Sequence, residues 1–417
     1  MGVKAAGRFY GWRVVRAAFI LAVFGWGLGF YGPPVFLNVL HESRGWPVLV
    51  VSSAISVHFL VGAVAGANMP ALHHRFGAVL VTKAGSLSMA AGIVGFAMAA
   101  SPWQLFVAAA LSGIGWGTMS AAALNILVSP WFDRARPAAL GMAYNGGSVG
   151  GIVFSPLWVA AIAALGFPTA AVLIAVVMVV TLWILADSVF SRTPQSMGLR
   201  PDGDEPDAPV VSVTSADARP LPGAALWGDR RFITLSAGMT LGLFAQIGMI
   251  SHLYSLLVPA LGAQPAGLAM GFLTVMAIGG RTLLGWLMPL GADRRLVVCG
   301  GLVAQMAGCG ALILAAGTNV PLLLAGVVLF GVGFGNTNSL PPLIAQVEFV
   351  KADVPRVAAL IVAIAQAGFA LSPAFFALIR EWNPPAAGEA AGLAPALFAT
   401  VAAMQCLAIC AYLAGRR

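Results

Sequence analysis

The chain carries the run GIGWG at residues 113–117 and a second copy of that pattern, GVGFG, at residues 331–335. Both runs lie inside long apolar stretches and are about 218 residues apart. Glycines spaced in this way let two membrane helices approach closely. A nucleotide-binding loop would instead need a preceding strand and a following helix, which the apolar surroundings do not suggest. The two runs therefore predict close helix packing at equivalent places in a duplicated fold.

Other residues repeat in the same order and at nearly the same separation. The matching pairs are Gly66 with Gly285, Pro70 with Pro289, and Ser155-Pro156 with Ser372-Pro373. Each match is weak by itself, but their shared order and spacing indicate an internal duplication. Internal repeats with a substrate site between them are typical of secondary transporters.

The composition identifies a protein that crosses a membrane many times. Hydrophobic residues make up 60% of the 417 residues and charged residues only 9%, and the mean hydropathy is +0.92. A soluble protein could not bury so much apolar surface. We predict an all-α membrane protein with about twelve transmembrane helices, because helices satisfy their own backbone polar groups in lipid.

Residues 190–228 interrupt the apolar pattern with Pro, Asp, Ser and Gly. This composition is typical of a solvated linker. We therefore predict two pseudo-symmetric six-helix bundles, at 1–189 and 229–417, joined by a cytoplasmic linker.

The distribution of positive charge predicts the orientation. The formal net charge is +8, and most of the 22 Lys and Arg residues lie at the two termini or in every second loop. The opposite loops contain only Arg44 and Arg380. This positive-inside bias predicts a multi-pass protein of the inner (cytoplasmic) membrane with both termini in the cytoplasm. It also explains the basic charge without a nucleic-acid partner.

Arg281 lies where a charge is costly. It is inside the apolar run 265–290, and about a dozen residues separate it from Asp293, which places it roughly 18 Å deep in the bilayer. Its guanidinium stays charged, and such residues mark substrate paths. The acidic residues of the sequence lie in loops and at helix ends, so the sequence favours a mobile anion as the counter-charge.

The residues after the predicted second helix resemble the gating motif of the major facilitator superfamily, Gly-x-x-x-Asp-Arg-x-Gly. Residues 70–77 read PALHHRFG and keep Arg75 and Gly77, with a histidine at the Asp position. The second copy retains Asp293 and Arg294. The resemblance covers nearly the whole chain and implies a gating role for Arg75, Asp293 and Arg294.

Two further runs are similar to the monocarboxylate-porter and oxalate–formate-antiporter branch of that superfamily. They are GRTLLG at 280–285 and WFDRAR at 131–136. In that branch the helix-8 arginine binds the substrate carboxylate, a role that the resemblance gives to Arg281. The chain has Gln366 in the helix where oxalate-type members add a lysine, and Ala277 where many monocarboxylate members have an acid. We therefore expect a monoanion as substrate.

The duplication maps His58 onto Ala277, one helical turn from Arg281. His58 is then either a protonation switch or second anion contact, or a neutral histidine that packs between helices. His252 is the second candidate for proton coupling, with packing or gating as the alternative. Besides Arg281 and His58, the candidate substrate-binding residues are Tyr31, Trp116, Tyr144, Asn145, Phe334, Asn336 and Gln366.

These observations predict a secondary active transporter that moves a small organic anion by alternating access. We expect a monomer in the lipid bilayer, with a proton or a counter-anion as candidate coupling partner. No cofactor, metal site or enzymatic constellation is expected. The alternatives are efflux of drugs or other solutes, nitrate-type anion uptake, and a non-transporting membrane sensor. A buried carboxylate would favour cationic drugs, and failure to move any solute would favour a sensor.

Overall fold

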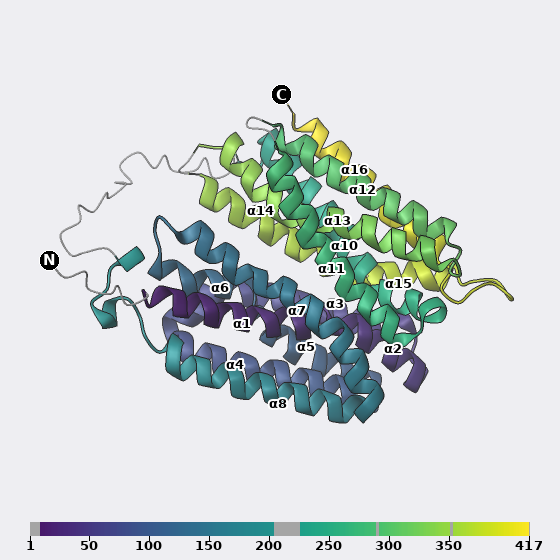
Figure 1. Cartoon of the computed structure of the whole chain (residues 1–417), viewed down its shortest axis with the longest axis horizontal. Helices are drawn as coiled ribbons and strands as arrows, with labels where there is room; N and C mark the ends of the chain where they lie inside the picture. Colours follow the sequence, from purple (N-terminus) through teal and green to yellow (C-terminus); the bar gives the residue numbers. More distant parts are fainter. Residues whose placement is uncertain (1–8, 204–225, 289–291, 351–352, 417) are drawn as a thin grey trace. The chain divides into compact units, whose positions relative to one another are not determined.

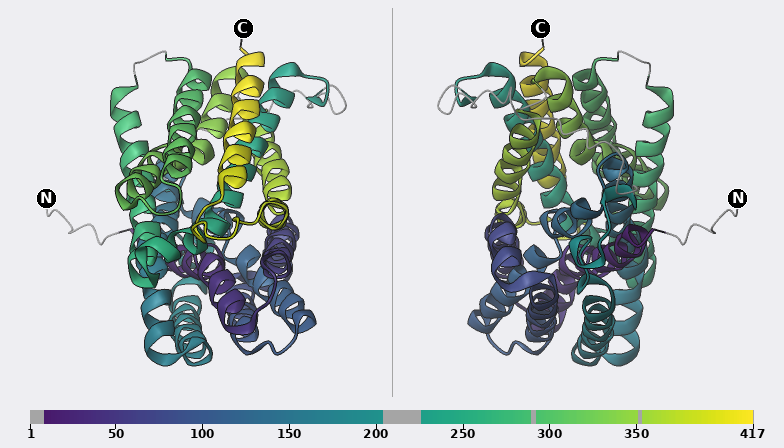
Figure 2. Two further views of the ribbon diagram at one scale, coloured as in Figure 1. Left: turned by 90° about the vertical axis from the view of Figure 1, so that its right-hand side faces the viewer. Right: turned by 90° about the vertical axis from the view of Figure 1, so that its left-hand side faces the viewer.

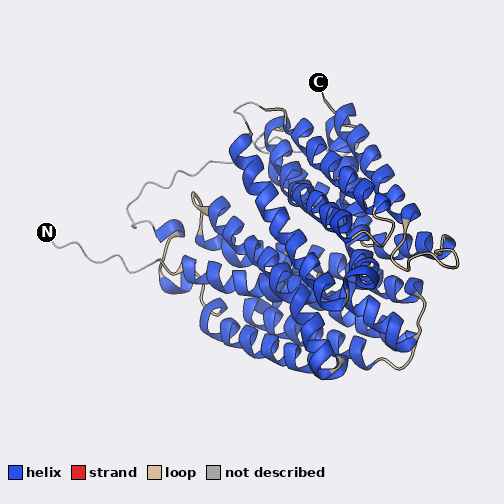
Figure 3. Ribbon diagram, turned by 45° about the vertical axis from the view of Figure 1, so that its right-hand side comes forward, coloured by secondary structure: helices blue, strands red, loops and turns tan. Residues whose placement is uncertain are grey.

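A computed structural model describes residues 9–203, 226–288, 292–350 and 353–416. The described residues form helices and loops and contain no strand, as Figure 3 shows. Twelve segments of the described chain are long and apolar enough to cross a membrane. The all-α prediction with twelve membrane spans is confirmed. Much of the predicted linker (204–225) and Pro289 of the second repeat lie outside the described residues.

The chain divides into two compact units. The first comprises Met1–Gly32, Val61–Phe154 and Ala161–Val213, and the second comprises Pro33–Leu60, Ser155–Ala160 and Thr214–Arg417. Residues 33–60 and 155–160 thus belong with the second unit although they precede the predicted linker. The division into bundles at 1–189 and 229–417 stays a prediction.

Figure 1 labels the helices along the chain. The earlier helices are α1 (Gly11–Gly29), α2 (Gly32–Arg44), α3 (Val48–Ala67), α4 (Met69–Met98), α5 (Pro102–Thr118), α6 (Ala121–Val128), α7 (Arg136–Leu165) and α8 (Phe167–Leu185). The later helices are α10 (Arg230–Leu261), α11 (Ala263–Leu287), α12 (Arg294–Leu314), α13 (Val320–Glu348), α14 (Val354–Phe369), α15 (Ser372–Trp382) and α16 (Pro395–Ala414).

Four membrane spans of the described chain each contain more than one helix. They are Gly11–Arg44, Pro102–Trp131, Phe167–Phe190 and Arg356–Trp382. In the last, α14 ends at Phe369 and α15 begins at Ser372, directly before Pro373. Proline has no N–H and cannot continue the hydrogen bonding of a preceding helix. Such breaks leave backbone groups that side chains of other helices can reach.

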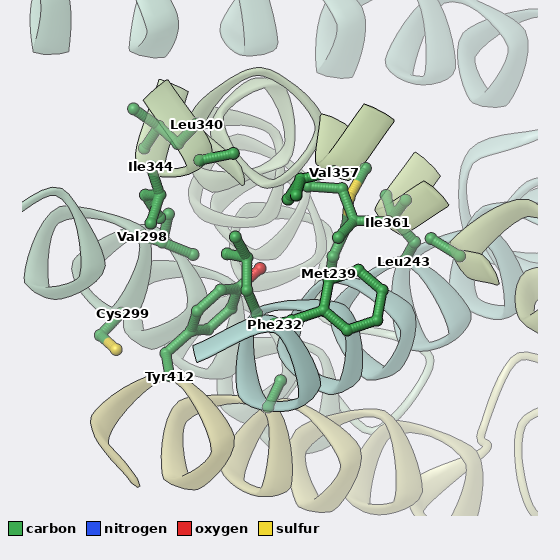
Figure 4. Packing of buried hydrophobic residues seen from close by; sticks show 14 of the residues in the cluster. Phe232, Met239, Leu243, Val298, Cys299, Leu340, Ile344, Val357, Ile361 and Tyr412 are labelled. Atoms are coloured by element: carbon green, nitrogen blue, oxygen red, sulfur yellow. The ribbon is translucent and has the colours of Figure 1, made fainter. Parts of the chain in front are cut away.

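The core of the second unit is apolar and shared among five helices. Figure 4 shows Phe232, Met239 and Leu243 of α10 facing residues of α12, α13, α14 and α16. Tyr412 of α16 is fully buried in this cluster. In Figure 2 the yellow helix α16 runs alongside the green helices of the same unit. This core holds together the helices that carry most of the polar residues discussed below.

The residues of the gating motif include a backbone break. Gly77 has φ 74° and ψ 163° within α4, a conformation that side-chain-bearing residues rarely adopt. Arg75, just before it, is exposed, and its guanidinium lies 5.1 Å from the centre of the Phe76 ring. The glycine of the motif therefore has a steric reason to be there.

In the first unit, Asp202 binds the start of α7. Its carboxylate accepts hydrogen bonds from the backbone N–H groups of Arg134 (2.7 Å), Asp133 (3.0 Å) and Ala135 (3.3 Å). Its side chain is only 9% exposed. Burial opposes ionisation, but the N–H groups of Arg134, Asp133 and Ala135 outweigh it, so the pKa of Asp202 is lowered. The beginning of the predicted linker is thus bound to the first unit.

We predict that this contact stabilises the first unit in a pH-dependent way. A lowered pKa in the folded state means that ionised Asp202 contributes stability above its ordinary pKa of about 3.9. That contribution is lost as the pH falls through the lower folded-state value. In detergent, Asp202→Asn should therefore melt below the wild type at pH 6, and the difference should shrink below about pH 4.

Asp187→Asn is the matched control, because Asp187 is exposed and pairs with Lys83 at 2.7 Å outside any cluster of backbone N–H groups. An unchanged melting temperature in Asp202→Asn at pH 6 would contradict a stabilising role for the Asp202 contact.

Candidate substrate site around Arg281

Helices α11 and α13 are in backbone contact along the second glycine run. A Cβ added to Gly331 would lie 2.7 Å from the carbonyl oxygen of Leu273, and one added to Gly280 would collide with the carbonyl of Val332. The helices can approach this closely only because these positions lack side chains. These contacts agree with the packing role that the sequence predicts for this glycine run.

Arg281 lies at the same contact, on α11. A Cβ added to Gly335 would lie 3.2 Å from Nε of Arg281 and would collide with the carbonyl of Ala277. The arginine side chain therefore lies against the bare backbone of α13, and it is partly buried. The absence of a side chain at Gly335 leaves the room that the guanidinium uses.

The equivalent position in the first unit is filled differently. Gly62 of α3 corresponds to Arg281 by the repeat, and a Cβ there would collide with the indole of Trp116 on α5. Trp116 is 9% exposed and packs on Trp26, with ring centres 5.0 Å apart, and on Phe30 at 6.2 Å. The first unit thus places an aromatic ring where the second places a charged side chain.

Tyr31 belongs to this aromatic cluster of the first unit. It lies at the break between α1 and α2, is 5% exposed, and packs edge-on against Phe30 at 4.9 Å. Tyr144 of α7 is partly buried, and its hydroxyl donates to the carbonyl of Ala121 at 3.4 Å. Asn145, beside it in the sequence, is exposed. The structure therefore brings Tyr31 and Trp116 into one cluster, with Tyr144 bonded to a different helix.

In the second unit, Phe334 and Asn336 flank Gly335. Phe334 is 8% exposed and Asn336 is 5% exposed. A Cβ on Gly301 of α12 would lie 3.6 Å from Cβ of Asn336, so this asparagine packs toward α12. Gln366 of α14 is partly buried. Arg281, Phe334 and Asn336 therefore lie within one turn of the contact at Gly335.

A buried amide network ties four helices of the second unit together. Nε2 of Gln246 on α10 donates to Thr337 Oγ1 on α13 (2.6 Å) and to Gln305 Oε1 on α12 (3.0 Å). Gln405 of α16 donates to the same Gln305 oxygen at 2.9 Å. All four side chains are at most 1% exposed. This network was not predicted from the sequence, because its signal is a single glutamine in each of α10, α12 and α16 and one of several polar residues in α13.

The two candidate coupling histidines both lie in the second unit. His58 of α3 is 1% exposed and packs on Phe59, which in turn packs on Phe369 at the end of α14. His252 of α10 is fully buried, with Nε2 3.0 Å from the carbonyl of Pro373 and Nδ1 3.2 Å from Nη1 of Arg380. Arginine can only donate, so Nδ1 accepts and Nε2 donates, which defines a neutral tautomer. These contacts favour packing or gating for His252.

The predicted gating residues of the second copy make specific contacts. Asp293 caps α12 by accepting from the N–H of Arg295 and pairs with Arg416 at 2.7 Å. Arg294 donates to the carbonyl of Leu343. The most buried cation here is Arg295, which is 1% exposed and donates to both carboxylate oxygens of Glu348, from Nε at 2.6 Å and from Nη2 at 2.8 Å. This bidentate pair was not singled out from the sequence, because Arg295 follows a motif arginine and looks like a loop charge.

Comparison with known proteins identifies the family. The family model for the Major Facilitator Superfamily matches residues 17–373. The chain therefore belongs to the Major Facilitator Superfamily and is a multi-pass membrane transporter with twelve spans.

Solved structures agree with this fold. A bacterial homolog of the human lysosomal transporter Spinster, in an inward-facing and unoccupied conformation, is 15% identical, with a TM-score of 0.76 and coverage of 99% of both chains. The nucleoside transporter NupG is 13% identical, with a TM-score of 0.72 over 98% of this chain and 99% of its own. At these identities the likeness shows the fold alone.

Curated relatives match only a short piece of sequence. Multidrug resistance protein MdtH from Yersinia pestis (strain Pestoides F) is 42% identical over 78 residues, which is 19% of each chain. The same protein from Yersinia pseudotuberculosis serotype O:1b (strain IP 31758) matches to the same extent. The matched segment thus spans about a fifth of the length of these relatives.

We predict that Gly335→Ala displaces Arg281 and loosens the contact between α11 and α13. The added methyl group would meet the carbonyl of Ala277 and Nε of Arg281. Overpacking of this kind costs about 1–3 kcal/mol, which a thermal melt in detergent would detect. Gly279→Ala on α11 is the matched control, because a Cβ there meets nothing within 4 Å. Equal melting temperatures for the two variants would show that the contact between α11 and α13 accommodates an added methyl group, which would contradict the prediction.

Proposed function

We propose that this transporter moves a small organic anion, for which a monocarboxylate is the best candidate, with Arg281 as its fixed positive charge. The observation that supports the proposal is the position of Arg281, inside the apolar run 265–290 and against the bare backbone of α13. An arginine inside a membrane-spanning apolar run is typical of an ion or substrate path. Its fork of donors matches a planar carboxylate through two parallel hydrogen bonds.

The neighbouring side chains suit such a ligand. Phe334 and Asn336 adjoin Gly335 in α13, and Asn336 packs toward α12. They are the aromatic and amide candidates for this ligand in the second unit. One fixed cation balances one charge, so a monoanion of modest size fits this set better than a dianion.

We further propose that the protein works by alternating access and that its transport can be coupled to a proton. The charge distribution supports cytoplasmic termini in an inner membrane. His58 is our candidate for proton coupling, because it is buried in the second unit and is related to Ala277 by the repeat. His252 is the second candidate, and its contacts to Pro373 and Arg380 favour packing or gating. The substrate can also carry the proton itself.

Drug export is the second candidate function. The short match to the multidrug resistance protein MdtH favours it. Cationic drugs, however, call for a membrane-embedded carboxylate, and the acidic residues of this chain lie in loops or near helix ends. A drug substrate would therefore have to be neutral or anionic.

We predict that Arg281→Ala weakens binding of the transported anion roughly 30- to 1000-fold, because loss of a charged hydrogen bond at a buried site costs about 2–4 kcal/mol. Arg281→Lys should recover little of this, because lysine lacks the bidentate fork. Thr282→Ala is the matched control, since Thr282 is exposed and bonds only the carbonyl of Ile278. Wild-type affinity in a folded Arg281→Ala protein, measured by competition in proteoliposomes, would refute the anchor role.

We also predict that His58→Gln weakens accumulation driven by an imposed pH gradient and leaves counterflow without a gradient intact. Imidazole titrates near pH 6.5 and glutamine does not titrate, while both can form hydrogen bonds. His41→Gln is the control, because His41 is exposed and bonds only the carbonyl of Trp46. Full gradient-driven accumulation in His58→Gln would make His58 a packing residue.

A further inference from the structure

A small cavity lies beside Arg380 at one end of the second unit. Its volume is about 30 Å³, and it is bounded by the ends of α10 and α15, the segment 383–394 and the start of α16. Its lining is mostly apolar and includes Leu256, Ile379, Leu393 and Leu397, with Arg380 and Asn383 as its longer polar side chains. This cavity is separate from the residues around Arg281.

Arg380 has neutral partners and unused donors. Its Nη1 donates to Ser255 Oγ at 2.8 Å and contacts Nδ1 of His252 at 3.2 Å. Its Nε and Nη2 make no hydrogen bond to the described residues. The guanidinium remains charged, and its N–H donors on Nε and Nη2 are left for an occupant of the cavity.

The nearby carboxylates are engaged elsewhere. Glu381 accepts a hydrogen bond from the backbone N–H of Leu49 at 2.9 Å, and Glu389 accepts one from Ala386 at 2.7 Å. Among the described residues, Arg380 makes no ion pair within 4 Å. The charge of Glu381 acts on Arg380 through space, but its carboxylate bonds the N–H of Leu49 and forms no ion pair with the guanidinium. A mostly buried guanidinium without an ion pair attracts an anion from solution.

We propose that this cavity binds a monatomic anion of the chloride class on Arg380. The size of the cavity sets the class of ligand, because about 30 Å³ holds one or two water-sized groups. Asn383 is exposed, and its Nδ2 donates to the carbonyl of Ile379 at 3.1 Å, which leaves its second amide N–H for the anion.

The site is connected to the break between α14 and α15. His252, which accepts from Arg380, donates to the carbonyl of Pro373 at 3.0 Å. The next N–H, on Ala374, donates to Ser56 Oγ of α3 at 3.1 Å. An anion that holds Arg380 in place therefore stabilises the contacts between α10, α15 and α3.

Thermal melting of the purified full chain in detergent tests the proposal. Sodium chloride replaces sodium gluconate at constant ionic strength, so that general screening does not change. We expect the melting temperature to rise by roughly 2 °C at chloride about tenfold above its Kd, and then to rise with the logarithm of the chloride concentration. Bromide should act in the same way.

Arg380→Gln should abolish this rise, and Arg44→Gln should keep it, because Arg44 is exposed on α2. If Arg380→Gln does not fold, Ala394→Val narrows the cavity while it retains the arginine. Chloride-35 NMR line broadening then reports binding directly in the wild type and should be lost in this variant.

Arg281→Ala should retain the chloride response, so this proposal and the transport proposal can fail separately. Three results would overturn the chloride site. The first is a wild-type melting temperature that does not depend on chloride, which means that the cavity holds water only. The others are an equal response in Arg380→Gln, and loss of the response in Arg281→Ala, which assigns the halide to the Arg281 site.

Discussion

The close approach of helix backbones at glycine positions is the constraint on which this structure depends. Lipid tails are as apolar as leucine, so apolar side chains gain little free energy by moving from lipid into a helix interface. Helix association in the membrane therefore relies on packing and on polar contacts between helices. Gly331 and Gly280 bring α11 and α13 together, and Gly335 continues this contact one turn farther along α13. The same contact places Arg281 against the backbone of α13. Packing and the candidate chemistry therefore share one set of residues.

Polar side chains complete the assembly of the second unit at different levels. Gln246, Gln305, Thr337 and Gln405 join four helices in its interior. Arg295 and Glu348 join helix ends, and His252, Arg380 and Ser56 join the helices around Pro373. Each cluster satisfies groups that would be costly to leave unpaired in an apolar surrounding. The two repeats differ at the position of Arg281. In the first unit, the indole of Trp116 fills the space that corresponds to the surroundings of Arg281.

The sequence predicted the fold well because its signals are long and repeated. Apolar runs predicted the helices, and the duplicated glycine runs at 113–117 and 331–335 predicted close packing at two equivalent places, but not which helices are the partners. The site was harder to predict. Arg281 was visible because one charge in an apolar run is rare, but the direction of its side chain depends on Gly335, which lies 54 residues away. Arg295 was overlooked because burial of a residue next to a loop follows from tertiary packing. The amide network needed partners on four helices, which no local pattern reveals.

The measurement that tests the central claim most directly is counterflow in proteoliposomes with a panel of labelled organic solutes at several pH values. The panel should contain lactate- and pyruvate-like monoanions, oxalate and succinate as dianions, a nucleoside, and a cationic drug. The account predicts saturable exchange of one or more monoanions, weak exchange of dianions, and no exchange of the nucleoside or the cation. Robust exchange of the cationic drug with no exchange of any carboxylate would contradict the role of Arg281 as an anion anchor.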